Sequence, residues 1–221
     1  MLRAVRIAVL LCIVCATYLH AQVFHDDFDG TSLDPAKWTI AGGGTVAVAG
    51  GFATLSSTNG DMFPYVTSVT NSFPPTGDFL IRVGFRYPDP RLGGNGFGSP
   101  NGLVIGNPGV GFWVWQDQLI GGGLRAACGD NLVQLAPAPE TNYHVYEWRC
   151  IGTTYSFYVD AQLVATDASK FRPNGFFFGH PTPFTYCCGW TTQEIDFVHI
   201  EAGNLTPARA SSWGRVKALY R

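Results

Sequence analysis

Residues 79–87 alternate regularly between apolar and other side chains, and this pattern restricts the fold more than any other feature of the chain. The apolar side chains on one face are Phe79, Ile81, Val83, Phe85 and Tyr87. The residues between them include Arg82, Gly84 and Arg86. A period of two residues is typical of a strand that buries one face in an antiparallel sheet. The segment therefore predicts a half-buried strand.

Similar short segments recur along the chain, separated by turn-forming residues. Residues 45–48 and 52–55 flank Gly50-Gly51 and predict a hairpin. A three-stranded meander is predicted at 143–150, 154–160 and 162–166, although its turn at Asp160-Ala161 is weak because alanine tolerates a positive φ poorly. Further strands are predicted at 101–106, 111–117, 124–127, 132–135, 175–179 and 193–201. Many short strands without helical periodicity predict an all-β sandwich or barrel in one domain.

The first 21 residues have the layout of a signal peptide. Arg3 and Arg6 precede an unbroken apolar run at 7–14, and a boundary of polar and small residues follows near 20–22. The run is shorter than the roughly 20 residues that span a bilayer. A lipoprotein signal at Cys15 is the alternative, but the bulky Val14 before it argues against this. The expected product is secreted or displayed at the cell surface, with a domain at 22–203, a tail at 204–221 and no membrane span.

Four cysteines remain after this cleavage, namely Cys128, Cys150, Cys187 and Cys188. An even number in an exported chain favours disulfides, and the spacing lacks the paired C-x-x-C of a zinc site. The adjacent pair could join in a strained ring, or the 187–188 loop could be tied to both other cysteines. The aromatic loop at 180–190 would then form a staple over the core, which we favour slightly, or the rim of a binding surface.

The C-terminal tail has a helical pattern of its own. Trp213, Val216 and Tyr220 would share one face of a helix that begins after Ser211-Ser212. Such a tail could be a docked chain end or a recognition tag with a partner. The chain has no basic run and no aromatic-basic interleaving, which argues against a nucleic-acid partner.

Three segments resemble the concanavalin A-like lectin and glucanase superfamily, particularly the branch with family-16 glycoside hydrolases and laminin-G-like modules. They are residues 28–38, which open with FDGTSLD and end with Lys37-Trp38, residues 146–164, which contain YEW and YSFYVDAQLV, and residues 194–200, EIDFVHI. They follow one another in the order of the family. The resemblance implies a jelly-roll β-sandwich of two antiparallel sheets, and we expect a bacterial source.

The catalytic motif of the family's hydrolases is incomplete in this chain. A retaining glycosidase needs two carboxylic groups about 5–5.5 Å apart, and in this family a Glu-x-Asp-x-x-Glu strand supplies them. Only Glu194-Ile195-Asp196 matches the start of that motif; His199 occupies the third acid's place, and the segment follows the hairpin that it should precede. Residues 111–130, where the catalytic strand should lie, contain no glutamate. The chain also has no nucleophile-elbow pattern and no His-x-x-x-His pair.

A binding function is therefore the favoured interpretation. Alternation along 111–117 places Trp113, Trp115 and Asp117 on one face and Phe112, Val114 and Gln116 on the other. If the second set faces the core, the tryptophans could stack on sugar rings. Nearby polar contacts could come from Arg125, Asn95 and Asn101. The alternative, weighed equally, is that the tryptophans are themselves core residues.

The resemblance alone implies a structural calcium ion. Relatives hold it with the aspartate of the last strand and with backbone carbonyls near the first hairpin, which by motif correspond to Asp196 and Gly51. Calcium takes six to eight oxygen ligands, so these two residues would need further partners. The alternative is that Asp196 caps or pairs within the sheet.

The sequence predicts a secreted, non-catalytic module that binds a polysaccharide, another glycan or a surface ligand. Two alternatives remain. One is a divergent glycoside hydrolase or lyase of the same fold, with acids supplied by loops. The other is a structural or adhesive extracellular domain without a glycan ligand.

Overall fold

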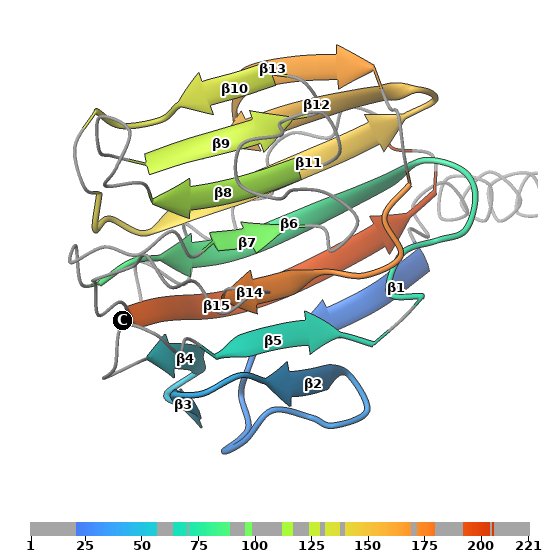
Figure 1. Ribbon diagram of the computed structural model, residues 1–221. Helices are drawn as coiled ribbons and strands as arrows, with labels where there is room; N and C mark the ends of the chain where they lie inside the picture. Colours follow the sequence, from blue (N-terminus) through green and yellow to red (C-terminus); the bar gives the residue numbers. More distant parts are fainter. Residues whose placement is uncertain are drawn as a thin grey trace, which may run out of the picture.

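The computed structural model describes the central part of the chain as an all-β sandwich (Figure 1). The described residues are 21–56, 64–69, 71–88, 96–98, 112–116, 124–128, 131–137, 140–168, 172–179, 192–203 and 205. Within these ranges all regular elements are strands, and every pairing between them is antiparallel. No helix in these ranges is long and apolar enough to cross a membrane. The predicted fold class is confirmed, whereas the C-terminal tail lies outside the described residues.

The first sheet contains eight of the described strands in the order β13-β12-β11-β6-β15-β4-β3, with β1 also paired to β15. Their bounds are β1 Ala21–Asp26, β3 Thr45–Ala49, β4 Phe52–Ser56, β6 Phe79–Arg86, β11 His144–Ile151, β12 Thr154–Val159, β13 Gln162–Ala168 and β15 Thr192–Ala202. The strongly alternating segment identified in the sequence is β6, which lies in the middle of this sheet between β11 and β15.

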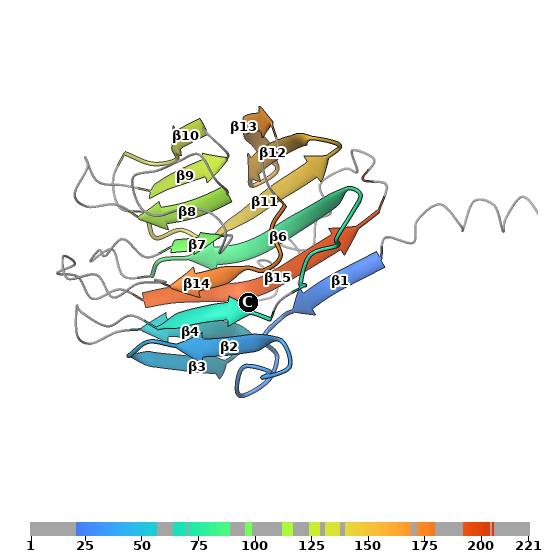
Figure 2. The same cartoon turned by 45° about the vertical axis from the view of Figure 1, so that its right-hand side comes forward.

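The second sheet contains seven of the described strands in the order β10-β9-β8-β7-β14-β5-β2. Their bounds are β2 Trp38–Ala41, β5 Tyr65–Ser68, β7 Gly96–Gly98, β8 Phe112–Gln116, β9 Leu124–Cys128, β10 Asn131–Gln134 and β14 Phe177–Gly179. Figure 2 shows the two layers clearly where β8–β10 lie over β11–β13. Each sheet therefore has one inner face toward the other sheet and one outer face.

The core lies between the two inner faces, and alternation selects its residues. In β6 the predicted apolar set is buried almost completely, whereas Arg82 and Arg86 remain partly exposed on the outer face. The seven-stranded sheet contributes Val66, Val114, Ala126 and Phe178 to the same core. The predicted packing role of Tyr146 and Trp148 is confirmed, since both are buried on β11.

Four strands of the structure, β1, β2, β5 and β7, were not predicted from the sequence, and three of them are very short. β2 and β5 have four residues each and β7 has three, two of them glycine. So few residues cannot show a period of two, and their strand conformation depends on the neighbours with which they pair. β1 was missed because it begins at Ala21, where the signal-peptide boundary was predicted. The strand predicted at 101–106 lies outside the described residues.

The β12–β13 turn has the positive φ angles that the sequence analysis identified as unfavourable for alanine. Asp160 and Ala161 both have positive φ, of 49° and 68°. Two successive residues with positive φ are the signature of a type I′ turn, which glycine favours at the second position. Asp160 also fixes the turn to β11, because its carboxylate accepts hydrogen bonds from the Val145 amide (2.9 Å) and from the His144 ring (2.7 Å).

Replacing Ala161 by glycine is expected to stabilise the protein by about 0.5–1 kcal/mol. The backbone strain of an alanine at positive φ is removed, and this gain exceeds the cost of the higher conformational entropy that glycine gives the unfolded chain. Chemical denaturation measures the effect. Ala36→Gly is the matched control, since Ala36 is also exposed but has no positive φ, and this variant should lose stability. A destabilised Ala161→Gly variant would contradict the prediction.

Candidate functional site

The outer face of the seven-stranded sheet carries a row of aromatic side chains. Trp113 on β8 and Phe177 on β14 are separated by Gly98 of β7, which pairs with both. Because glycine has no side chain, the two rings meet edge-on above it, with centroids 5.8 Å apart. Tyr65 on β5 continues the row, with its ring centroid 5.4 Å from that of Phe177. We refer to Tyr65, Phe177 and Trp113 as the aromatic row.

Alternation explains why the aromatic row faces away from the core. Val114 and Phe178, the chain neighbours of two of its members, belong to the core cluster, whereas the row itself does not. The two residues therefore lie on opposite faces of β8, as predicted, and the structure decides the orientation that the sequence left open, with Val114 inward and Trp113 outward. The expectation of an exposed Trp113 is corrected, because only 2% of its surface is accessible and its edge packs against Phe177. Tyr65 is the partly exposed member of the row.

Polar side chains lie beside the aromatic row on the same face. Arg125 of β9 pairs with Gln134 of β10, and its chain neighbours Leu124 and Ala126 belong to the core, so Arg125 and Gln134 point outward from the sheet. Thr67 of β5 pairs with Phe177. The structure therefore brings Trp113 and Arg125 onto one face, as predicted. The side chain of Trp115 and the predicted residues Asp117, Asn95 and Asn101 lie outside the described part of the structure.

The strands of this sheet contain no aspartate or glutamate. The region in which the family resemblance places the catalytic strand forms β8 and β9, with the sequences FWVWQ and LRAAC. The remaining five strands, from Trp38–Ala41 to Phe177–Gly179, are also without acids. These strands therefore do not supply the pair of carboxylic groups that a retaining glycosidase requires.

The glutamates of the described strands lie on the outer face of the other sheet. Glu147 of β11 pairs with Arg82 and Arg149, and Glu194 of β15 pairs with Arg86. The predicted interpretation of the 194–201 segment as a structural strand is therefore supported by its central place in the eight-stranded sheet. Carboxylates bound in this way to guanidinium groups stabilise the sheet surface.

The expected disulfides are not found at Cys128 and Cys150. Both residues are present as thiols, and both side chains project into the core between the sheets, with at most 2% of their surface exposed. Burial, together with the charge of Asp167, raises the pKa of the Cys128 thiol to about 12, so it is protonated and unreactive at neutral pH. Cys187 and Cys188, with the whole loop at 180–190, lie outside the described residues.

The two residues expected to bind calcium lie at the same end of the β4–β15 pairing. Asp196 is buried in the bulge of β15, immediately after Ile195, which pairs with Ala53. Gly51, with a φ of 77°, is in the β3–β4 turn two residues before Ala53. Calcium needs six to eight oxygen ligands, so these two residues would need several further partners. A calcium site therefore stays a prediction.

Comparison with known proteins places the fold. No family model matches the sequence, and no curated protein matches it. Solved structures do match. A β-1,3-glucanase from Mycobacterium marinum has a TM-score of 0.53 at 14% identity, over 82% of this chain and 99% of that one. A structure from a study of endo-acting O-glycanases of human gut bacteria that initiate mucin breakdown has a TM-score of 0.57 at 16% identity, over 82% and 99%.

A third similar structure is described as an immunostimulatory antigen and pseudo β-1,3-glucanase of Mycobacterium tuberculosis. Its TM-score is 0.56 at 10% identity, over 82% of this chain and 98% of that one. Identities this low establish shape and topology and leave activity open. Together with the two antiparallel sheets, they show that the chain has the concanavalin A-like jelly-roll fold of the family-16 β-glucanases.

Proposed function

We propose that the protein is an exported, non-catalytic module that binds a polysaccharide through the outer face of its seven-stranded sheet. One observation carries the proposal. The strands of this sheet present an aromatic row with polar neighbours and contain no acid, although their fold is that of glucanases. A face of this composition can hold a sugar chain but lacks the strand-borne carboxylates for cleaving it by the retaining mechanism.

The chemistry of the face suits a neutral sugar chain. Sugars bind proteins through stacking of their C–H faces on aromatic rings and through hydrogen bonds from their hydroxyls. Tyr65 is partly exposed beside the buried Phe177, which holds the tyrosine ring in a fixed position. Arg125 and Gln134 offer hydrogen-bonding groups on the same face. We assign Tyr65 and Arg125 as the principal binding residues.

The proposal predicts that Tyr65→Ala weakens polysaccharide binding by about 3- to 10-fold, the loss expected for one aromatic contact. A glycan array would first identify the ligands, with laminarin and mucin glycans included because the similar structures include a β-1,3-glucanase and a study of mucin-degrading O-glycanases. Titration calorimetry would then give the dissociation constants of the wild type and the variant.

Tyr158→Ala is the matched control, because Tyr158 is a partly exposed tyrosine on the outer face of the opposite sheet, where it packs under Arg149. Equal affinities of the two variants would place the binding site elsewhere. Release of reducing sugar from a bound polysaccharide would instead identify a divergent hydrolase and direct the search to Asp117, Asp130 and Glu194. Absence of any glycan ligand would favour a structural or adhesive domain.

A further inference from the structure

Three metal-ligating side chains that are far apart in the sequence meet on the eight-stranded sheet. His25 on β1 is the direct cross-strand partner of His199 on β15. Asp27 follows immediately after the end of β1. The ligating atoms of the three residues all lie within 4.8 Å of one another. We refer to His25, Asp27 and His199 as the histidine cluster.

The histidine cluster lies on the outer face of its sheet, on the opposite side of the sandwich from the aromatic row. Phe24, the neighbour of His25, and Val198 and Ile200, the neighbours of His199, all belong to the core. Their side chains point inward, so those of the two histidines point outward. The side chains of His25, Asp27 and His199 are 40%, 28% and 25% exposed, and an ion could reach them from the solvent.

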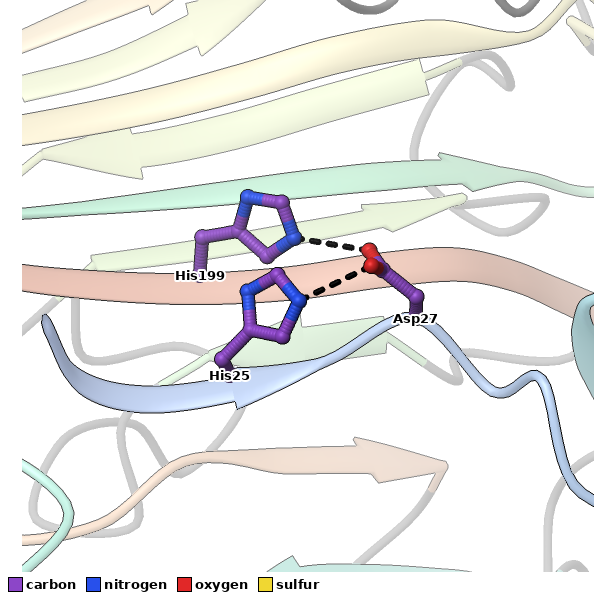
Figure 3. Close-up of side chains that lie close together, drawn as sticks. All are labelled: His25, Asp27 and His199. Atoms are coloured by element: carbon purple, nitrogen blue, oxygen red, sulfur yellow. Dashed lines mark hydrogen bonds and ion pairs between the residues drawn. The ribbon is translucent and has the colours of Figure 1, made fainter.

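Both imidazoles are directed at the same carboxylate, as Figure 3 shows. The Nε2 atom of His25 lies 2.8 Å from Oδ2 of Asp27, and the Nε2 atom of His199 lies 2.8 Å from Oδ1. The two rings are stacked, with centroids 4.0 Å apart and an angle of 23° between their planes. The two imidazole rings are therefore in contact, and their Nε2 atoms converge on the carboxylate of Asp27.

We propose that the histidine cluster is a binding site for one divalent transition-metal ion, with zinc as the representative ion. Two imidazoles and a carboxylate are ligands that zinc accepts, and three protein ligands leave one position for water. Calcium and magnesium prefer all-oxygen sites, so this donor set selects against them. The site shares no residue with the predicted calcium ligands Asp196 and Gly51.

The rearrangement needed for metal binding is small. Zinc–nitrogen and zinc–oxygen bonds of about 2.0–2.2 Å in a tetrahedron separate neighbouring ligand atoms by about 3.3 Å. The present separations between the Nε2 atoms and the Asp27 oxygens are 2.8 Å. Because the three ligating atoms all lie within 4.8 Å of one another, each has to move by about an ångström or less. Metal binding at Nε2 of His25 requires the ring proton to sit on Nδ1, so the hydrogen bond from Nε2 to Asp27 is exchanged for a bond to the metal.

The charge state of the cluster is also suited to a cation. Burial lowers the pKa of His199, although its hydrogen bond to Asp27 acts in the opposite direction. Burial raises the pKa of Asp27, but its hydrogen bonds and ionic contacts with His199 and His25 outweigh burial and lower the pKa overall. Asp27 is therefore a carboxylate, and it supplies the negative charge of the site.

The neighbouring strand β6 carries a positive charge that would repel a cation, but carboxylates already pair with it. Arg82 on β6 is the cross-strand neighbour of His199. Its guanidinium is paired with Glu147 and, at 3.4 Å, with Glu201. These two carboxylates hold the positive charge within their own network, so its repulsion of an ion at the histidine cluster is reduced.

Zinc titration of the purified full-length protein, prepared without a polyhistidine tag, tests the proposal. Calorimetry with zinc chloride should show about one ion per chain, and the melting temperature should rise with zinc concentration. His199→Gln and His25→Gln should each weaken binding by at least about 100-fold, because even partners outside the ligand shell commonly change affinity 10- to 100-fold. Asp27→Asn should weaken it as well.

His144→Gln is the matched control. His144 is also a strand histidine bound to an aspartate, Asp160, but among the described residues it does not belong to a cluster of three possible metal ligands. This variant should bind zinc as the wild type does, and excess calcium should not displace the zinc. Circular dichroism and melting without metal verify that each variant is folded. The proposal is overturned if the wild type takes up no zinc, or if the His25 and His199 variants bind zinc as tightly as the wild type.

Discussion

Replacement of Gly179 by alanine is expected to destabilise the protein by at least about 3 kcal/mol, the combined cost of backbone strain and overpacking. Gly179 ends β14 with a φ of 88°, a conformation that side-chain-bearing residues rarely adopt. A Cβ atom there would overlap the carbonyl oxygen of Pro64 and lie 3.0 Å from its carbonyl carbon. Both obstacles are backbone atoms, so the strand that follows Pro64 would have to move.

The expected displacement would also disturb the candidate binding face. Gly179 pairs with Tyr65, the exposed member of the aromatic row, and its amide donates a hydrogen bond of 3.1 Å to Oε1 of the buried Gln193. Movement of β5 away from β14 would weaken both contacts. We therefore expect Gly179→Ala to reduce polysaccharide affinity as well as stability.

Gly152→Ala is the matched control for this experiment. Gly152 also has a positive φ, of 59°, but an added Cβ would meet no atom within 4 Å. Its replacement should cost about 1 kcal/mol from strain alone. Denaturant unfolding gives the free energy of unfolding of both variants, and the difference between their losses is the cost of the collision with Pro64. Equal losses of stability in the two variants would show that the collision is relieved without cost.

Replacement of Glu147 by leucine is expected to cost about 3 kcal/mol, because it leaves two guanidinium groups without their shared carboxylate. Glu147 is 8% exposed on β11, and its two oxygens accept hydrogen bonds from the Nε atoms of Arg82 and Arg149. The side chains of the two arginines are only 20% and 14% exposed. Water can therefore replace the lost carboxylate only in part.

Glu194→Leu provides the comparison for Glu147→Leu. Within the described part of the chain Glu194 pairs only with Arg86, whose side chain is 39% exposed, and exposed ion pairs contribute about 0–1 kcal/mol. Replacing Glu147, Arg82 and Arg149 together by leucine should recover much of the loss, since no buried charge then remains unpaired. Urea unfolding measures all three variants. Similar losses for the two single variants would mean that water solvates the Glu147 network fully.

The family resemblance noted in the sequence and the structural comparisons agree on the fold, and they leave the activity open. Three segments carried the resemblance, and all three form structural parts of the sandwich. Trp38 lies in the core, Tyr146 and Trp148 pack between the sheets, and the last segment is β15. These positions define a jelly roll whichever ligand it binds.

Local pattern was enough to predict the long strands and their buried faces. In β6 and β11 an alternation of eight residues decides which side chains enter the core, and membership of the core cluster follows that alternation, although the outward-facing Leu80 and Glu147 are also buried. The Asp160-Ala161 turn could also be located, together with its strain, because both depend on neighbouring residues. Such features need no knowledge of distant parts of the chain.

The tertiary structure alone decided which residues share a site. His199 and Asp27 are 172 residues apart, and only the pairing of β1 with β15 brings them into contact. The contact of Trp113 with Phe177 likewise depends on a three-residue strand between them, whose glycine leaves room for both rings. Alternation placed Trp113 and Val114 on opposite faces, but it could predict neither which face is the core nor that Phe177 would cover the edge of Trp113. A period in the sequence determines the direction of a side chain, whereas long-range strand pairing determines its neighbours.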